Sequence, residues 1–334
     1  MPLLRPCRSL PHAVCLLLLA AACLASPPTL ARASTTETER LHQWLDEQYA
    51  EELRFTPEKL TSLGSKALYD KLNDYSDEGE QRRLDWLRRS VASMRQQFDR
   101  EALTDEGALS YDFWAYRLQR AQDTREFADH RYAFSQITAP HVDLPKLLIN
   151  DHRVDTVSDL EAYISRLNGI GVAMRQNLER AKTAADRDIR APRFAYDTVI
   201  DQATRVISGA PFDDGDSDSA LWRDALDKID ALLQTSVITA TQAHDYEERV
   251  KAALLGPFLA GYRDVIAWLR ADRDETSAQA QGVYALPRGE AFYAERLRYN
   301  TTTDLSADEI HAIGKAEVAR LQAAMQGILE RVEF

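Results

Sequence analysis

The side chains best suited to metal chemistry are the histidines, and the nearest histidine–acid pair is His244 with Glu247 or Glu248. A spacing of three or four residues places both partners on one face of a helix. The pair supplies at most two ligands, whereas a catalytic zinc takes three ligands and a water. His141 and His152 flank an apolar segment, but their spacing alone does not bring them together. We therefore predict a surface ion pair at His244 and no metal ligands in this chain.

Other catalytic motifs are also missing from the sequence. There is no His-Glu-x-x-His, no Gly-x-Ser-x-Gly, no phosphate-binding glycine loop and no dinucleotide fingerprint. The acidic run Asp213–Asp218 lacks the glycine and glutamate of an EF-hand, so we interpret it as a polar loop before a helix. The pairs Arg82-Arg83 and Arg88-Arg89 are interpreted as a solvated helix face rather than an anion site. We assign no catalytic residue.

The most strongly patterned stretch lies near the C-terminal end of the sequence. Gly282–Leu286 is short and apolar, which predicts a strand or an extended segment, and Pro287 suits the first turn of a helix. Ser306 and Glu309 have the spacing of a capping box, which predicts that a second helix begins there. Apolar residues then recur at helical spacing: Ile310, Ile313, Leu321, Met325, Ile328 and Val332.

The same stretch carries a family pattern of Leu-Pro-x-Gly, a tyrosine-containing helix, a threonine turn and Glu-Ile-His-x-x-Gly-x-x-Glu-Val. The matching residues are Leu286, Pro287, Gly289, Tyr293, Leu297, Thr301–Thr303, Glu309, Ile310, His311, Gly314, Glu317 and Val318. The pattern resembles the hallmark segment of a bacterial family, domain of unknown function family 885. The upstream segment 135–167 is similar to that family as well.

The resemblance implies more chemistry than the residues themselves do. The family resembles zincin-type zinc metallopeptidases, with an expected helix bearing a His-Glu motif and a later glutamate as zinc ligands. Those elements belong after the segment just described, and this chain stops at Phe334. It therefore resembles the N-terminal half of the family domain, with zinc implied for the full-length protein but no cofactor in this chain. Its expected partner is the missing C-terminal half, and its expected ligands are peptides.

Three residues in the hallmark segment are candidates for contacting a substrate: Tyr293, Arg298 and His311. In a complete metallopeptidase a tyrosine or histidine could stabilise an oxyanion. An arginine could hold a substrate carboxylate through two hydrogen bonds. The alternative is that Arg298 and His311 only satisfy helix ends beside the threonine turn.

The first 33 residues are predicted to be a signal peptide. Two arginines precede the apolar run Ala13–Ala22, which is too short to span a bilayer, and an Ala-x-Ala cleavage signal ends at Ala33. We therefore expect a periplasmic or secreted protein. The alternative is a lipoprotein anchored through Cys23, which follows three alanines.

Composition excludes several classes of function. The net charge is −12, which argues against a nucleic-acid-binding protein. All three cysteines lie within the predicted leader, so the mature chain would have neither disulfides nor thiol chemistry. No later run is long and apolar enough for a transmembrane helix.

Helical periodicity and capping residues dominate residues 34–334, which predicts an all-α array with at most one or two short strands. Helices are predicted over Ser34–Leu53, Tyr196–Ile207 and Leu221–Leu233. Other helices are predicted to start at Thr56, Ser76, Thr104, Leu144 and Thr156. A long helix is predicted over Ser236–Ala271, with a kink at Pro257. An aromatic stripe from Tyr111 to Leu118 is interpreted as core.

Two functions fit these observations. The first is the N-terminal, cleft-forming part of an exported zinc peptidase, inactive alone because the metal site lies elsewhere. The second is a helical periplasmic binding module without catalysis. The presence or absence of a zinc motif after this region in the natural protein distinguishes them.

Overall fold

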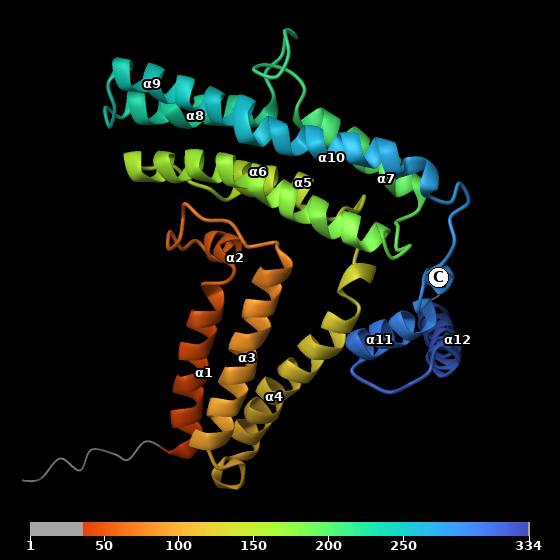
Figure 1. Ribbon diagram of the computed structural model, residues 1–334. Helices are drawn as coiled ribbons and strands as arrows, with labels where there is room; N and C mark the ends of the chain where they lie inside the picture. Colours follow the sequence, from red (N-terminus) through yellow and green to blue (C-terminus); the bar gives the residue numbers. More distant parts are fainter. Residues whose placement is uncertain (1–35, 333–334) are drawn as a thin grey trace, which may run out of the picture.

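The computed structural model describes residues 36–332, and within that range the chain is all-α, as the sequence predicts. Its helices form an upper group and a lower group, with a last pair of helices beside the lower group (Figure 1). No strand occurs in the part that the structure describes; the nearest feature is an isolated bridge between Ala210 and Asp218. None of the described helices has an apolar stretch long enough to cross a membrane.

The lower group contains α1 (Glu37–Leu53), α3 (Asp77–Gln97) and α4 (Asp105–Glu126), and the short α2 (Pro57–Ser62) connects it to the upper group (Figure 1). The three long helices share a core that is rich in aromatic rings. Its buried members are Leu41, Trp86, Leu87, Val91, Met94, Phe98 and Trp114. The aromatic stripe of α4 contributes Trp114 to this core, and Tyr111 and Leu118 pack against it, but Tyr116 is exposed, so the core interpretation is confirmed only in part.

The upper group is built around α6, the longest helix. Its members are α5 (Pro140–Asn150), α6 (Val157–Ala185), α7 (Arg193–Val206), α8 (Ala220–Gln234), α9 (Ala240–Ala253) and α10 (Leu259–Asp272). The predicted kink at Pro257 is confirmed. A π-helical segment, Leu254–Phe258, joins α9 to α10, and Gly256 within it has non-helical dihedral angles.

Most predicted helix starts are correct because their caps are local. The side chains of Ser76, Thr104 and Thr156 each accept a hydrogen bond from a backbone N–H three residues later. The predicted capping box of the last helix is also present. The Ser306 hydroxyl accepts from the Glu309 N–H, and the Glu309 carboxylate accepts from the Ser306 N–H at 2.8 Å.

Of the two alternatives for Gly282–Leu286, a strand or an extended segment, the strand is wrong. Residues Val283–Ala285 form a 3₁₀ turn, closed by a hydrogen bond from the Leu286 N–H to the Val283 carbonyl at 3.1 Å. The turn packs so closely on the start of α11 that a Cβ on Gly289 would lie 1.9 Å from that carbonyl. No other strand is available to pair with this segment in the described range, so its backbone bonds locally.

The last two helices are α11 (Gly289–Thr301) and α12 (Ala307–Arg331). Helix α11 begins two residues after Pro287, because Arg288 adopts a left-handed conformation with φ of 56°. Helix α12 buries none of its described residues. The apolar stripe predicted for it exists but faces solvent, and a Cβ on Gly314 would meet nothing within 4 Å.

Candidate functional site

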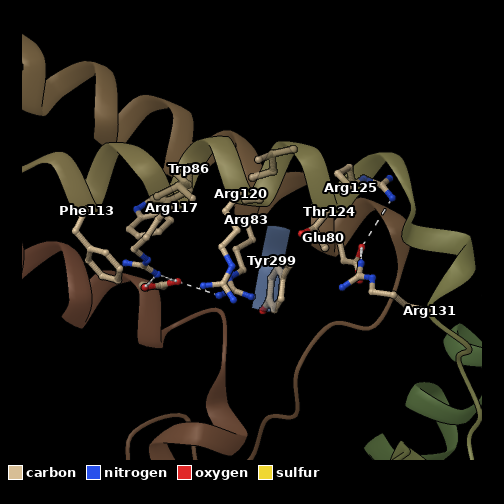
Figure 2. A pocket seen from close by; sticks show the side chains of 14 residues that line it. Glu80, Arg83, Trp86, Phe113, Arg117, Arg120, Thr124, Arg125, Arg131 and Tyr299 are labelled. Atoms are coloured by element: carbon tan, nitrogen blue, oxygen red, sulfur yellow. Dashed lines mark hydrogen bonds and ion pairs between the residues drawn. The ribbon is translucent and has the colours of Figure 1, made fainter. Parts of the chain in front are cut away.

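A cavity of about 330 Å³ lies between α3, α4 and α11. In Figure 2, Phe113 and Arg117 lie at one end of it and Arg125 and Arg131 at the other. Its lining residues are Glu52, Glu80, Arg83, Leu84, Trp86, Leu87, Phe113, Arg117, Arg120, Ala121, Thr124, Arg125, Arg131 and Tyr299. We call this cavity the arginine cleft.

The arginine cleft is positively charged within an acidic protein. Five arginines line it against two glutamates, whereas the whole chain carries a net charge of −12. In Figure 2 the side chains of Arg83 and Arg120 reach the same part of the cleft, beside the ring of Tyr299, and Arg117 lies nearer Phe113. A cavity lined with one sign of charge and walled by protein concentrates the opposite charge.

One end of the cleft is organised by a buried carboxylate. Glu52 is 7% exposed and accepts hydrogen bonds from Arg117 at 2.7 Å and from Arg83 at 2.9 Å. Burial alone would raise the pKa of Glu52, but the hydrogen bonds from Arg117 and Arg83 outweigh it and lower the pKa. The carboxylate is therefore ionised and fixes both arginines in the cleft.

The opposite end contains more cations than anions. The Glu80 carboxylate is shared by Arg180 at 3.2 Å, Arg131 at 3.4 Å and Arg125 at 3.8 Å. The pKa of Arg131 is lowered, first by burial and then by the charges of neighbouring arginines, although Glu80 opposes the shift. An additional anion here would be electrostatically favourable.

Arg120 lies between these ends and has no carboxylate partner. Among residues 36–332, no acidic oxygen lies within 4.0 Å of its guanidinium, and its buried Nε has no hydrogen-bond acceptor. Its guanidinium carbon lies 3.5 Å from the centroid of the Tyr299 ring, a cation–π contact. Arg120 is thus held in place by an aromatic ring while its hydrogen-bonding capacity remains unused.

Helix α11 brings Tyr299 to the cleft through buried contacts with α4. Glu295 is 2% exposed, pairs with Arg296 at 2.6 Å and accepts from the Thr124 hydroxyl at 3.2 Å. Burial would raise the pKa of Glu295, but the ion pair with Arg296 lowers it. Phe292 is also buried against Phe127, at 5.8 Å between ring centroids. The hallmark segment therefore contributes one wall of the cleft.

None of the three residues singled out from the sequence lines the arginine cleft. Tyr293 lies on α11 and is half exposed. Arg298, also on α11, lines a neighbouring cavity of about 290 Å³ together with Tyr116 and Thr302. His311 is an exposed residue of α12. The structure places Tyr299, their neighbour on α11, in the cleft instead.

Sequence reasoning did not find the cleft arginines as a group. Arg82 and Arg88 pair with Asp74 and Asp85 on the solvated face of α3, as predicted. Arg83 on the same helix is also half exposed and paired, but it lines the cleft. The only signal in the sequence for α4 was the one-turn spacing of Arg117 and Arg120, which many solvated helices share.

The described residues do not fit a zinc site. No group of three or more histidine, cysteine, aspartate or glutamate side chains within residues 36–332 is placed to hold a metal ion. His244 is exposed and lies 3.7 Å from Glu247, in the geometry predicted for a surface pair. His141 and His152 are both buried and have different partners, Gln202 for the first and the Asp159 carbonyl for the second.

The fold and the site together define the class of this protein: an all-α protein with a cationic cleft beside its hallmark segment. The chain belongs to the family of bacterial proteins of unknown function called DUF885, which matches residues 57–334. No curated protein matches the sequence.

A solved structure shares the fold. It is described as "the putative lipoprotein from Colwellia psychrerythraea", with a TM-score of 0.66 and 18% sequence identity. The match covers 88% of the present chain and 51% of that protein, so this chain spans about half the length of its solved relative. At this identity the similarity establishes the fold alone. The predicted signal peptide, its cleavage near Ala33 and the alternative anchor at Cys23 lie outside the described residues.

Proposed function

We propose that residues 36–332 form the ligand-binding helical region of an exported bacterial protein, and that the arginine cleft binds an anionic group of the ligand. The observation that carries this proposal is Arg120, an arginine in a cavity that has no acidic partner among residues 36–332. Arginines that serve only structure are usually paired, as Arg83 and Arg117 are with Glu52.

The cleft is prepared for an anion in a specific way. Glu52 and Glu80 fix the surrounding arginines, and Tyr299 holds the Arg120 side chain in one orientation. A bound anion would therefore gain charge-assisted hydrogen bonds without much loss of side-chain entropy. The two carboxylates that line the cleft, Glu52 and Glu80, are both paired with arginines, so we assign the cleft a binding role.

Anion binding is tested by thermal unfolding in phosphate and in chloride at equal ionic strength. We expect phosphate to raise the unfolding midpoint of the wild-type chain, because a ligand that binds only the folded state stabilises it. Replacing Arg120→Met should weaken phosphate binding by about 10-fold or more, the equivalent of roughly 1.5–3 kcal/mol for a hydrogen bond to a charged group.

The matched control is Arg95→Met, which removes the same charge from an exposed position of α3. This control should respond to phosphate as the wild type does. Equal phosphate stabilisation in the wild type and in Arg120→Met would contradict the proposal.

We also propose that the whole protein is a zinc-dependent peptidase whose metal ligands are not among residues 36–332. The family resemblance supports this, as does the exposed apolar stripe of α12, which a further helical part of the same polypeptide would cover. Tyr293, Arg298 and His311 would then contact the substrate. The alternative is a binding module without catalysis.

These two alternatives differ in metal content. A protein that includes the rest of the family domain should bind one zinc per chain and hydrolyse peptides, whereas residues 34–334 alone should do neither. Elemental analysis and a peptide-cleavage assay measure both properties. Tight zinc binding by residues 34–334 would contradict the proposed location of the metal site, and a longer protein with no zinc would favour the binding module. In an active protein, full turnover after alanine replacement of Tyr293, Arg298 or His311 would remove that residue from the substrate site.

A further inference from the structure

Helix α4 carries a row of exposed apolar side chains that leads to Arg120. Leu109 is 70% exposed, Phe113 57% and Tyr116 39%. Spacings of four, three and four residues place Leu109, Phe113, Tyr116 and Arg120 on one face of the helix. Large apolar side chains aligned at the surface of a soluble protein commonly mark a binding surface.

This row is continuous with the arginine cleft. Phe113 lines the cavity together with Trp86, Arg117 and Arg120. In Figure 2 the ring of Phe113 lies at the Glu52 end of the cleft, on the side of Arg117 away from Tyr299. The surface therefore has a cationic end at Arg120 and an apolar end at Phe113 and Leu109, and it is complementary to a ligand with the opposite arrangement.

From this surface we infer that α4 binds the C-terminal segment of an extended peptide, with the free carboxylate at Arg120 and apolar side chains over Phe113 and Leu109. The inference rests on the proposed function, because it names the ligand class of the same anion site. The Arg120 guanidinium would donate to the terminal carboxylate through its Nη groups, because its Nε is buried.

Dimensions support a peptide in this position. With a rise of about 1.5 Å per helical residue, Phe113 lies about 10 Å and Leu109 about 16 Å along α4 from Arg120. An extended peptide advances about 3.3 Å per residue, so these levels correspond to the third and fifth residues before its C-terminal residue. Those two residues point to the same side of an extended chain, and both would face α4.

The surroundings of the row favour a peptide over a fatty acid. The row is open to solvent, and charged groups flank it: Asp112 pairs with Arg100 at 2.6 Å beside Phe113, and Arg117 pairs with Glu52. A peptide backbone stays hydrated or hydrogen-bonded in such surroundings. An acyl chain would leave much of its apolar surface in water.

The test uses isothermal titration calorimetry with the acetylated peptide Leu-Ser-Leu-Ser-Ser-Ala, as the free acid and as the C-terminal amide. The wild-type chain should bind the acid at least about 10-fold more tightly than the amide, because only the acid carries the terminal charge. Arg120→Met should remove this difference, and Arg120→Lys, which keeps the charge, should restore part of it. Phe113→Ser should weaken both peptides and keep their ratio.

Arg95→Met is again the control and should bind both peptides as the wild type does. Equal binding of acid and amide to the wild type would overturn the inference, while stabilisation by phosphate would leave the proposed function intact. Loss of both effects would overturn both. Tighter binding of decanoate than of the peptide acid would also overturn the inference, because it would assign the surface to acyl chains.

Discussion

Replacing Gly171 with alanine is expected to destabilise the protein by about 3 kcal/mol or more, the upper range for overpacking a core. Gly171 lies where α6 passes the π-helical segment, and a Cβ there would be 2.1 Å from the carbonyl oxygen of Pro257. Gly261 of α10 approaches from the same side, because its own Cβ would lie 3.0 Å from the Cα of Gly171. Backbone atoms cannot rotate away, so the two helices would have to separate.

The matched control for this prediction lies two residues earlier on the same helix. A Cβ on Gly169 would be 3.3 Å from a side-chain carbon of Leu72, which can move. Gly169→Ala should therefore change stability much less than Gly171→Ala, since higher helix propensity offsets the contact. Urea unfolding followed by far-ultraviolet circular dichroism compares the two variants. Similar midpoints for both would show that α6 is not held closely at Gly171.

Replacing Arg166 with methionine is expected to cost about 3 kcal/mol or more, because each buried acceptor left unsatisfied costs roughly 1–3 kcal/mol. The Arg166 side chain is fully buried and has no acidic partner within the described residues. It donates to the Lys71 carbonyl at 2.9 Å and to the Thr61 hydroxyl at 2.7 Å. The side chain thereby joins α2 and the segment after it to α6.

A histidine completes the network around Arg166. Burial, with the nearby charge of Arg166 as a smaller cause, lowers the pKa of His152 to about 4, so the ring is neutral at pH 7. Its Nε2–H then donates to the Asp159 carbonyl, and its Nδ1 accepts from Arg166 at 3.1 Å. Methionine would fill part of the space of Arg166 and supply none of these donors.

The control for Arg166→Met is Arg175→Met, on the same helix at an exposed position. Both variants lose one positive charge, so a difference in their urea midpoints reports the buried hydrogen bonds. We expect Arg175→Met to lie within about 0.5 kcal/mol of the wild type, as exposed substitutions usually do. A similarly small effect of Arg166→Met would contradict the structural role assigned to this network.

The arginine cleft and the Arg166 network illustrate two different uses of arginine in one chain. Arg166 is satisfied by uncharged acceptors and is sealed from solvent. Arg120 is only partly buried, and its Nε has no acceptor. On the helix face of Arg166 the neighbours are Ala162, Tyr163, Gly169 and Ile170, whereas the face of Arg120 also carries Arg117 and Asp123.

Local chemistry allowed the sequence by itself to determine the all-α class, most helix starts and the family. The capping residues Ser76, Thr104 and Ser306 act within three residues of their own positions, and Pro257 disturbs the helix that contains it. Such signals need no knowledge of the rest of the chain. The strand predicted at Gly282–Leu286 failed because a strand needs a partner, and no local pattern shows whether one exists.

Only the tertiary structure decided where the arginine cleft lies. Arg83, Arg120 and Tyr299 come from α3, α4 and α11, and packing between helices far apart in sequence brings them to one cavity. The sequence selected Tyr293, Arg298 and His311 from the hallmark segment, whereas packing of α11 against α4 placed Tyr299 in the cleft. Helix starts depend on hydrogen bonds within one turn, but a cleft depends on the relative positions of several helices, which the buried contacts of the whole chain determine.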